Sequence, residues 1–301
     1  MSRPPADTPS ANHNCLSIWF MMGGQPLAAS PSPLRIAELQ QSDAPPPRQR
    51  DRRAPRLFVS QSLATGETPV ETVTLEKQQS HYLSHVLRLG VGARVLLFNG
   101  MDGEWSARIV EAARGAVTLA PDDQTRPQVL GPDLHYLFAP LKHARLDYMV
   151  QKAVEMGVSR LAPVITERTE ARRVNLDRMH ANAVEAAEQC ELLSIPDIAT
   201  EERLAPALER LEPGRTLIFC DEDAPSANPL TALSGLPPGQ PLAVLIGPEG
   251  GFSDAERALI GRRPHVTRIS LGPRILRADT AAVAALAVIQ ATLGDWGARS
   301  P

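Results

Sequence analysis

Two segments near the C-terminal end of the chain carry residue types from which ligand sites are commonly built. The first spans residues 245–253 and reads Leu-Ile-Gly-Pro-Glu-Gly-Gly-Phe-Ser. Here an apolar strand ends in a loop whose three glycines permit tight turns and the close approach of a ligand. Ser253 and Glu256 then have the spacing of a capping box, which predicts the start of a helix. Ligands of open α/β sheets bind at such strand ends; the plain alternative is a glycine-rich turn with a good cap.

The second segment spans residues 271–280 and reads Leu-Gly-Pro-Arg-Ile-Leu-Arg-Ala-Asp-Thr. Arg274 and Arg277 flank an apolar pair, and Asp279 or Thr280 is predicted to cap a helix over residues 281–293. That helix is apolar on every side, so we expect it to be buried. Its N-terminus should face the same ligand region and favour an anion there. The alternative is that the two arginines are ordinary surface charges.

Other catalytic and metal-binding patterns are missing or weak. The sequence contains no dinucleotide-binding fingerprint, P-loop, zinc-protease helix or nucleophile elbow. His81 and His85 fall on one helical face, but no third ligand is nearby, so we predict that no metal is bound. Three scattered cysteines, Cys15, Cys190 and Cys220, indicate a reducing compartment without disulfides, hence a cytoplasmic protein. Cys190 is predicted to be a buried helix residue.

The composition limits the class of protein. With 301 residues the chain is long enough for two domains, and its 43% hydrophobic and 22% charged residues exclude wholesale disorder. A net charge of −3 excludes a strongly basic protein that coats nucleic acid but leaves a local basic patch open. No run approaches 18 apolar residues, so no membrane span is predicted. Residues 1–51 are proline-rich and are expected to be a disordered extension, with a signal peptide as the alternative for the apolar island at 16–22.

The periodicity of the remaining chain changes near residue 130. Residues 52–127 read as a small β-barrel with strands at 94–98, 105–110 and 116–119 and one helix over 78–89, whose stripe is Tyr82, Val86 and Leu89. Residues 125–132 are a plausible linker. Residues 132–297 alternate strand and helix, which predicts an α/β domain with a mostly parallel sheet covered by helices on both faces. The strands are expected at 135–139, 161–165, 216–220, 242–246 and 266–271, with helices after residue 142 and over 176–193.

Taken together, these segments resemble the RsmE family of ribosomal RNA methyltransferases in the SPOUT superfamily. The two loop motifs carry most of the resemblance, and residues 140–142 (Pro-Leu-Lys) and 151–158 (Gln-Lys-Ala-Val-Glu-Met-Gly-Val) add to it. Residues 163–169, 187–190, 56–59 and 81–90 also resemble family segments, so the likeness extends over roughly residues 52–295. Two positions depart from the family pattern: Asp279 stands where a glutamate is usual, and Leu192 where an arginine is frequent.

The resemblance implies a SPOUT-type fold, an α/β domain with a deep trefoil knot, preceded by a PUA-like RNA-binding β-barrel. It also implies a homodimer and a bent S-adenosylmethionine bound by the knotted loops. By the same analogy, the cofactor-binding residues are Leu245, Gly247, Pro248, Gly250, Gly251, Leu271, Gly272 and Leu276.

The implied reaction is methylation of N3 of a uridine in 16S ribosomal RNA of the small subunit. The uridine must lose its imide proton, so positioning and preformed donors are the main contributions available to the protein. Arg277 is the expected donor to the developing anion. Asp279 or Glu249 is expected to accept the proton if desolvation raises its pKa.

Basic residues of the α/β domain are consistent with an RNA partner. The expected RNA contacts are Lys142, Arg145, Lys152, Arg168, Arg172 and Arg173. A solvated charged face is the alternative, because Glu167 and Glu170 dilute the cluster. Two other functions stay open: a SPOUT methyltransferase acting on another RNA, such as a tRNA ribose 2′-hydroxyl, and a non-catalytic RNA-binding or assembly factor.

Overall fold

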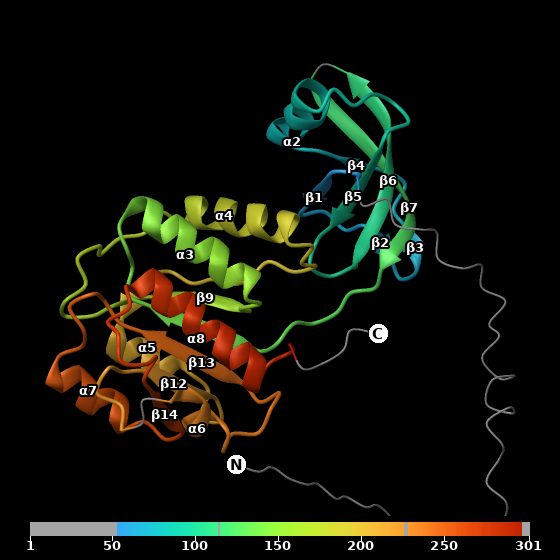
Figure 1. Ribbon diagram of the computed structural model, residues 1–301. Helices are drawn as coiled ribbons and strands as arrows, with labels where there is room; N and C mark the ends of the chain where they lie inside the picture. Colours follow the sequence, from blue (N-terminus) through green and yellow to red (C-terminus); the bar gives the residue numbers. More distant parts are fainter. Residues whose placement is uncertain (1–52, 114, 226–227, 297–301) are drawn as a thin grey trace, which may run out of the picture. The chain divides into compact units, whose positions relative to one another are not determined.

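The computed structural model describes residues 53–113, 115–225 and 228–296 (Figure 1). Within them, a five-stranded and a seven-stranded sheet have separate cores, and two further strands form a hairpin. The predicted disordered extension, residues 1–51, and Cys15 lie outside the described residues. Among the helices that are described, none is long and apolar enough to cross a membrane.

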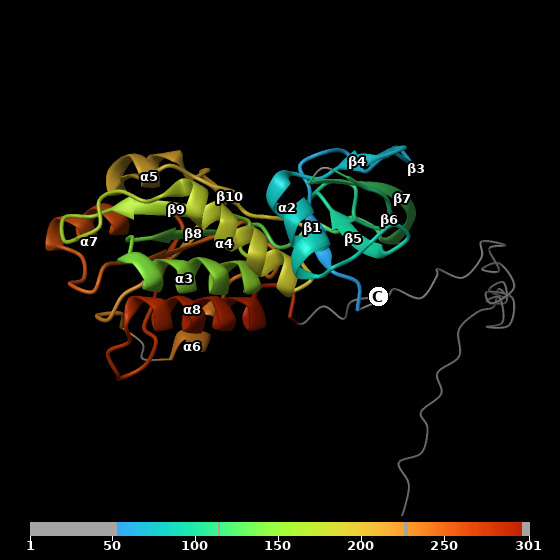
Figure 2. The ribbon, with the colours of Figure 1, turned by 90° about the horizontal axis from the view of Figure 1, so that it is seen from above.

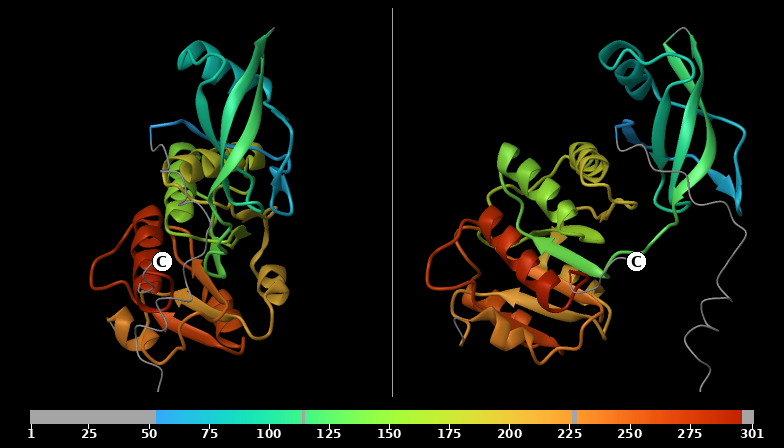
Figure 3. Two further views of the ribbon diagram at one scale, coloured as in Figure 1. Left: turned by 90° about the vertical axis from the view of Figure 1, so that its right-hand side faces the viewer. Right: turned by 45° about the vertical axis from the view of Figure 1, so that its right-hand side comes forward.

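The first sheet contains the strands predicted for the small β-barrel. Its order is β1 (Arg56–Phe58), β5 (Arg94–Phe98), β6 (Glu104–Ala113), β7 (Ala116–Arg126) and β4 (Val73–Thr74), with a separate hairpin of β2 (Ala64–Thr65) and β3 (Thr68–Pro69). Long strands β6 and β7 form the antiparallel centre, seen in both views of Figure 3. Alternate side chains such as Val95, Leu97, Trp105 and Leu119 are buried in one core, as period-2 packing requires. Strand β7 runs to Arg126, so the first two residues of the predicted linker are strand instead.

The predicted helix over residues 78–89 is only partly correct. It consists of α2 (Lys77–His81) followed by η1 (Tyr82–Val86), a turn of π-helix closed by Leu87 N–H donating to Tyr82 O at 2.9 Å. In a π-helix each hydrogen bond joins residues five apart, instead of four as in an α-helix, and this changes which side chains face the core. Leu83 is therefore fully buried, whereas Tyr82 and Val86 of the predicted stripe are 41% and 59% exposed.

The second sheet is parallel throughout, as predicted. Its order is β10 (Asp197–Ile198), β9 (Arg160–Ile165), β8 (Leu134–Phe138), β13 (Leu242–Ile246), β12 (Thr216–Cys220) and β14 (Val266–Ile269), with β11 (Glu202–Arg203) also paired to β9. The bounds of β12 and β13 equal the predicted ones, because both are short apolar runs buried on two faces.

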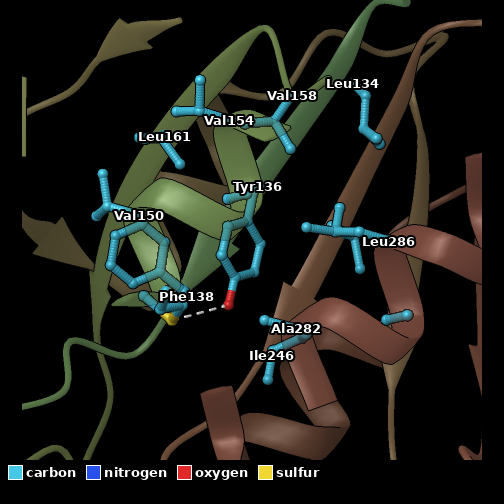
Figure 4. Packing of buried hydrophobic residues seen from close by; sticks show 14 of the residues in the cluster. Leu134, Tyr136, Phe138, Val150, Val154, Val158, Leu161, Ile246, Ala282 and Leu286 are labelled. Atoms are coloured by element: carbon cyan, nitrogen blue, oxygen red, sulfur yellow. Dashed lines mark hydrogen bonds between the residues drawn. The ribbon is translucent and has the colours of Figure 1, made fainter. Parts of the chain in front are cut away.

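Helices cover both faces of this sheet (Figure 2). Tyr136, Phe138 and Val244 face α3 (His143–Glu155), α4 (Leu176–Gln189), α6 (Pro229–Leu233) and α8 (Ala278–Thr292). Leu137 and Leu245 face α5 (Leu204–Arg210) and α7 (Asp254–Gly261). In the first of these cores the buried hydroxyl of Tyr136 donates to Met149 Sδ at 3.1 Å, between α3 and α8 (Figure 4).

Three expectations about α4 and α8 are corrected. Helix α4 ends at Gln189, and Cys190, its C-cap, is exposed rather than buried. Helix α8 begins three residues earlier than predicted, so Arg277 is its N-cap residue and neither Asp279 nor Thr280 caps it. One stripe of α8 is partly or fully exposed in the single chain, so the helix is not buried on every side.

Arg56 of β1 links the first sheet to the end of α4. Its side chain is 6% exposed, and its Nε donates to Glu104 Oε2 at 2.7 Å. Its other nitrogens donate to the carbonyl oxygens of Ala187, at 2.6 Å, and Leu192, while the guanidinium lies 3.7 Å from the centre of the Phe98 ring. Arg56 therefore binds one carbonyl in the last turn of α4 and one in the segment that follows the helix.

Candidate active site

A cavity of about 630 Å³ lies at the carboxyl ends of β12, β13 and β14. Its wall is made by both predicted loops, residues 246–252 and 270–276, and by Cys220, Glu222, Ala278 and Ala281. The volume is in the range of roughly 300–1,000 Å³ that is typical of small-molecule sites. The two segments that the sequence singled out therefore meet at one site, beside the N-terminus of α8.

The structure brings most of the predicted cofactor residues to this cavity. Those that line it are Gly247, Pro248, Gly250, Gly251, Leu271, Gly272 and Leu276. Leu245 is the exception, because its side chain is fully buried in the core on the α5 and α7 side of the sheet.

The loop after β13 is supported from inside. The Phe252 ring is 4% exposed and packs edge-on against Phe219 at 5.1 Å. A Cβ added at Gly247 would lie 2.4 Å from the Phe252 ring, so only glycine fits there. The predicted capping box is present: Ser253 Oγ accepts from Glu256 N–H at 3.3 Å and Glu256 Oε2 accepts from Ser253 N–H at 3.0 Å.

The loop after β14 has far fewer contacts. Gly272 has φ +99°, a conformation that other residues rarely adopt. Pro273, Arg274, Ile275 and Arg277 are exposed, Ile275 completely. The side chain of Arg277 makes no hydrogen bond or ion pair with any residue that the structure describes, whereas its carbonyl oxygen accepts from Ala281 N–H at 2.8 Å.

Asp279 lies in the first turn of α8 and is paired with a residue that the sequence did not connect to it. Arg145 of α3 donates from Nε and Nη2 to the two carboxylate oxygens of Asp279, at 2.9 and 3.0 Å. Its Nη1 donates to Glu249 Oε1 in the first loop. These hydrogen bonds lower the pKa of Asp279 despite its partial burial, and both carboxylates raise that of Arg145. The condition under which Asp279 was expected to accept a proton, a raised pKa, is therefore not met.

The expected RNA contacts fall into three groups. Lys142 forms an ion pair with Glu170. Arg168 Nη1 donates to Gly250 O at 2.7 Å and Arg145 donates to Glu249, so both arginines contact the first loop. Arg172 and Arg173 are exposed. Lys152 is set apart from the others: it lies in the last turn of α3, where its Nζ donates to Glu155 at 2.6 Å.

A charged network beside the cavity was missed at the level of sequence. Asp221, directly after β12, is 3% exposed and accepts from Arg268 Nε at 2.8 Å and from Arg257. Glu222 lines the cavity and accepts from Arg257 at 2.5 Å. The signal was the run Asp221-Glu222-Asp223 at a strand end beside the two loops. These carboxylates are close enough together to hold a metal ion, but each of them is already paired with Arg257, and Asp221 with Arg268 as well.

Cys220 is the thiol nearest to the site, and it lines the cavity. Burial raises its pKa to about 12, so the thiol stays protonated at neutral pH. Neither Cys220 nor the exposed Cys190 has the lowered pKa of an activated nucleophile, since burial also raises the pKa of Cys190.

Comparison with known proteins identifies the family. Residues 130–290 match the RNA methyltransferase domain family, and residues 75–122 match the RNA methyltransferase PUA domain. Ribosomal RNA small subunit methyltransferase E of Rickettsia conorii is 30% identical over 210 residues, covering 70% of this chain and 85% of that protein. The same enzyme of Synechocystis is 33% identical over 230 residues, covering 74% of each.

The chain belongs to the ribosomal RNA small subunit methyltransferase E family.

Solved structures agree with this membership. A Legionella pneumophila protein described as a methyltransferase, with bound SAM, matches with a TM-score of 0.69 at 28% identity, over 80% of this chain and 99% of that one. The methyltransferase E of Neisseria gonorrhoeae, bound to S-adenosyl methionine, matches with a TM-score of 0.69 at 25% identity, over 81% and 99%. The predicted resemblance to RsmE enzymes and the predicted SPOUT-type fold with a PUA-like domain are thereby confirmed.

Proposed function

We propose that the protein transfers a methyl group from S-adenosylmethionine to N3 of a uridine in 16S ribosomal RNA. The observation that carries the proposal is the cavity at the meeting of the two glycine-rich loops, in a chain of this family. Two related structures that share this fold carry the same cofactor. The RNA target follows from the names of the relatives, which act on small-subunit ribosomal RNA.

The residues present fit this cofactor. The cavity is large enough for a nucleoside, and close packing of Phe252 on Gly247 leaves a wall without a side chain at that point. Glycines at 250, 251 and 272 and the apolar Leu271 and Leu276 would hold it, beside the N-terminus of α8. When bound, S-adenosylmethionine supplies an electrophilic methyl on a cationic sulfonium, so the protein has to supply only position, charge and a proton acceptor.

The proposed catalytic residues have different roles in the reaction. Arg277 caps the start of α8 and is exposed, so its guanidinium is available to stabilise the imide anion that forms as N3 loses its proton. Glu249 lines the cavity and is the carboxylate that we assign to accept the proton. Asp279 has a lowered pKa, which suits a permanent anion that holds Arg145 beside Glu249 better than it suits a base.

The proposed domains are a PUA-like barrel over residues 52–127 and a methyltransferase domain over 132–297. Two separate cores and two separate family matches support this division. For RNA we propose contacts from Lys142, Arg168, Arg172 and Arg173. Lys152 is left out because it lies at the far end of α3, and Arg145 because it already donates to Asp279 and Glu249. A cytoplasmic location agrees with a ribosomal RNA substrate.

We also propose a homodimer. The exposed stripe of α8 is apolar apart from one threonine and recurs at helical spacing; its members are Thr280, Val283, Ala284, Ala287, Val288 and Ala291. Apolar surface of this kind is stabilised when a partner removes it from water. A second copy covers it, and light scattering at micromolar concentration with cofactor present should give twice the monomer mass.

The test of the proposed function is methyl transfer from labelled S-adenosylmethionine to unmethylated small-subunit particles, followed by mass spectrometry of the nucleosides. We expect 3-methyluridine as the only new product. A 2′-O-methylated nucleoside would show that the enzyme catalyses another SPOUT reaction. RNA binding without any methyl transfer would show that the protein is an assembly factor.

A further inference from the structure

We propose that Arg145 is a positioning residue for this reaction rather than an RNA-phosphate contact. Its guanidinium fixes Glu249 of the first loop and Asp279 of α8 in one arrangement at the edge of the cavity. The inference rests on the proposed function, and it reassigns a residue whose sequence position alone favoured an RNA contact.

The hydrogen-bonding geometry uses up most of the side chain's donors. Nε and Nη2 form a two-point contact with the Asp279 carboxylate, and Nη1 donates to Glu249. A guanidinium offers this planar fork, whereas a lysine ammonium does not. The Arg145 side chain is 30% exposed and that of Asp279 only 17%, so their contact is partly shielded from water. A phosphate would have to displace a carboxylate to gain an equivalent contact.

The three residues come from separate parts of the chain: helix α3, the first loop and helix α8. Arg145 lies in the first turn of α3, a helix anchored by the fully buried Met149, Val150 and Ala153. Glu249 lies in the first loop, 104 residues further along, and Asp279 another 30 residues later. A residue on a rigid helix that contacts a loop and a helix start is placed to set their separation.

Charge gives the contact a second consequence. Glu249 and Asp279 share one cation, so without Arg145 the two carboxylates would repel each other and move apart. The other groups that act on Asp279 are its neighbour's amide, Thr280 N–H at 2.9 Å, and the buried Tyr136 hydroxyl of β8, whose pKa Asp279 helps to raise. Lys142 is paired with Glu170 and acts on Glu249 only weakly.

The experiment compares four full-length variants: Arg145→Gln, Arg145→Lys, Arg178→Gln and Arg172→Gln. Arg178 is the matched control, because it also makes a two-point contact with an α3 carboxylate, Asp147, at 2.8 and 2.5 Å. Arg172 represents an exposed RNA-contact candidate. For each variant we would measure the affinity for S-adenosylhomocysteine by calorimetry, the melting temperature, turnover at saturating particles with its pH profile, and the salt dependence of particle binding.

We expect Arg145→Gln to lose about 100-fold in saturated turnover, the typical effect of misplacing reacting groups by an ångström. The pKa of the Asp279 carboxyl should rise in this variant, because the cation that lowers it is removed. Arg145→Lys should lose turnover as well, since it keeps the charge without the fork. Arg178→Gln should keep both turnover and the affinity for S-adenosylhomocysteine. Arg172→Gln should weaken particle binding and flatten its salt dependence, by about 0.7–0.9 in slope.

The proposal is overturned if Arg145→Gln only flattens the salt dependence of particle binding and keeps the saturated turnover of Arg178→Gln, or if Arg145→Lys has wild-type activity. A wild-type protein that binds S-adenosylhomocysteine but makes no 3-methyluridine would instead contradict the proposed reaction. In that case a shift in the product affinity of Arg145→Gln, with none in Arg178→Gln, still supports positioning, and equal affinities overturn it.

Discussion

The two loops that wall the cavity are built in opposite ways. The loop after β13 is supported by buried Phe252, by the capping box of Ser253 and Glu256, and by Arg168 donating to Gly250 O. The loop after β14 is exposed over most of its length, and the side chain of Ile275 has no protein cover. The first loop is thus preformed by its own contacts, whereas the second gains contacts only when something binds to it.

This difference assigns separate tasks to the two loops. A preformed wall lowers the ordering cost of binding and fixes where the ligand sits. An adaptable wall with an arginine at its end can close on a bound substrate and place a donor beside it. Changes at the closely packed positions of the first loop should therefore affect folding and binding together, and changes in the second loop should affect binding or turnover alone.

The largest effect is expected for Arg277→Lys, at the end of the second loop. A lysine lacks the planar fork of donors, and removing a preformed donor to a developing anion costs about 10²–10³ in turnover. The melting temperature should not change, because the side chain of Arg277 has no partner among the described residues. The prediction is tested by measuring the melting temperature, the cofactor affinity and the saturated turnover of this one variant. Joint loss of cofactor affinity and melting temperature with normal turnover would contradict the prediction.

In the first loop, Gly247→Ala should disturb both folding and binding. The new methyl would meet the Phe252 ring at 2.4 Å, and overpacking of this kind costs about 1–3 kcal/mol. Calorimetry with S-adenosylhomocysteine and thermal melting should both register the change.

Gly250→Val is the control for this loop. A Cβ at position 250 lies 3.5 Å from Arg168 Cβ, which is ordinary contact, so the variant should fold normally and still lose cofactor binding through its bulk on the cavity wall. Normal cofactor binding by Gly250→Val would show that residue 250 is not part of the cofactor site.

A smaller loss of stability is expected for Ser253→Ala. The hydroxyl accepts from Glu256 N–H at the start of α7, and loss of such a cap costs about 1 kcal/mol. Chemical denaturation of the variant should show a lower midpoint with an unchanged slope. An unchanged midpoint would mean that the first loop does not depend on its cap.

The smallest effect on folding is expected for Ile275→Ser in the second loop. A fully exposed side chain contributes little to the single chain, so the free energy of unfolding should stay within about 0.5 kcal/mol of wild type. The affinity for S-adenosylhomocysteine should fall, because the apolar side chain adjoins the cavity. A loss of stability comparable to that of Ser253→Ala would contradict the conclusion that the second loop contributes less to folding than the first.

Local patterns in the sequence were sufficient for the longer strands and for the position of the site, whereas the two-residue strands β2, β3, β4, β10 and β11 were not predicted. Strands β5, β12 and β13 have the predicted bounds because each is a short apolar run between turn residues. The two loops were found because glycine spacing and the capping box are local signals. Contacts between distant segments left no such signal: the pairing of Arg145 with Asp279 spans 134 residues. The π-turn at Tyr82 was missed for another reason, since an α-helical period was assumed throughout.

Arg56 bears on the order in which the chain is completed during synthesis. Its ion pair with Glu104 lies wholly within the N-terminal sheet, which can form while the rest of the chain is still being made. The carbonyl groups of Ala187 and Leu192, which the same side chain also binds, are synthesised more than 130 residues after it. The sheet that forms first therefore already contains the arginine side chain that later binds the carbonyl groups at the end of α4. A nascent chain that stops before residue 192 lacks one of these two carbonyl groups.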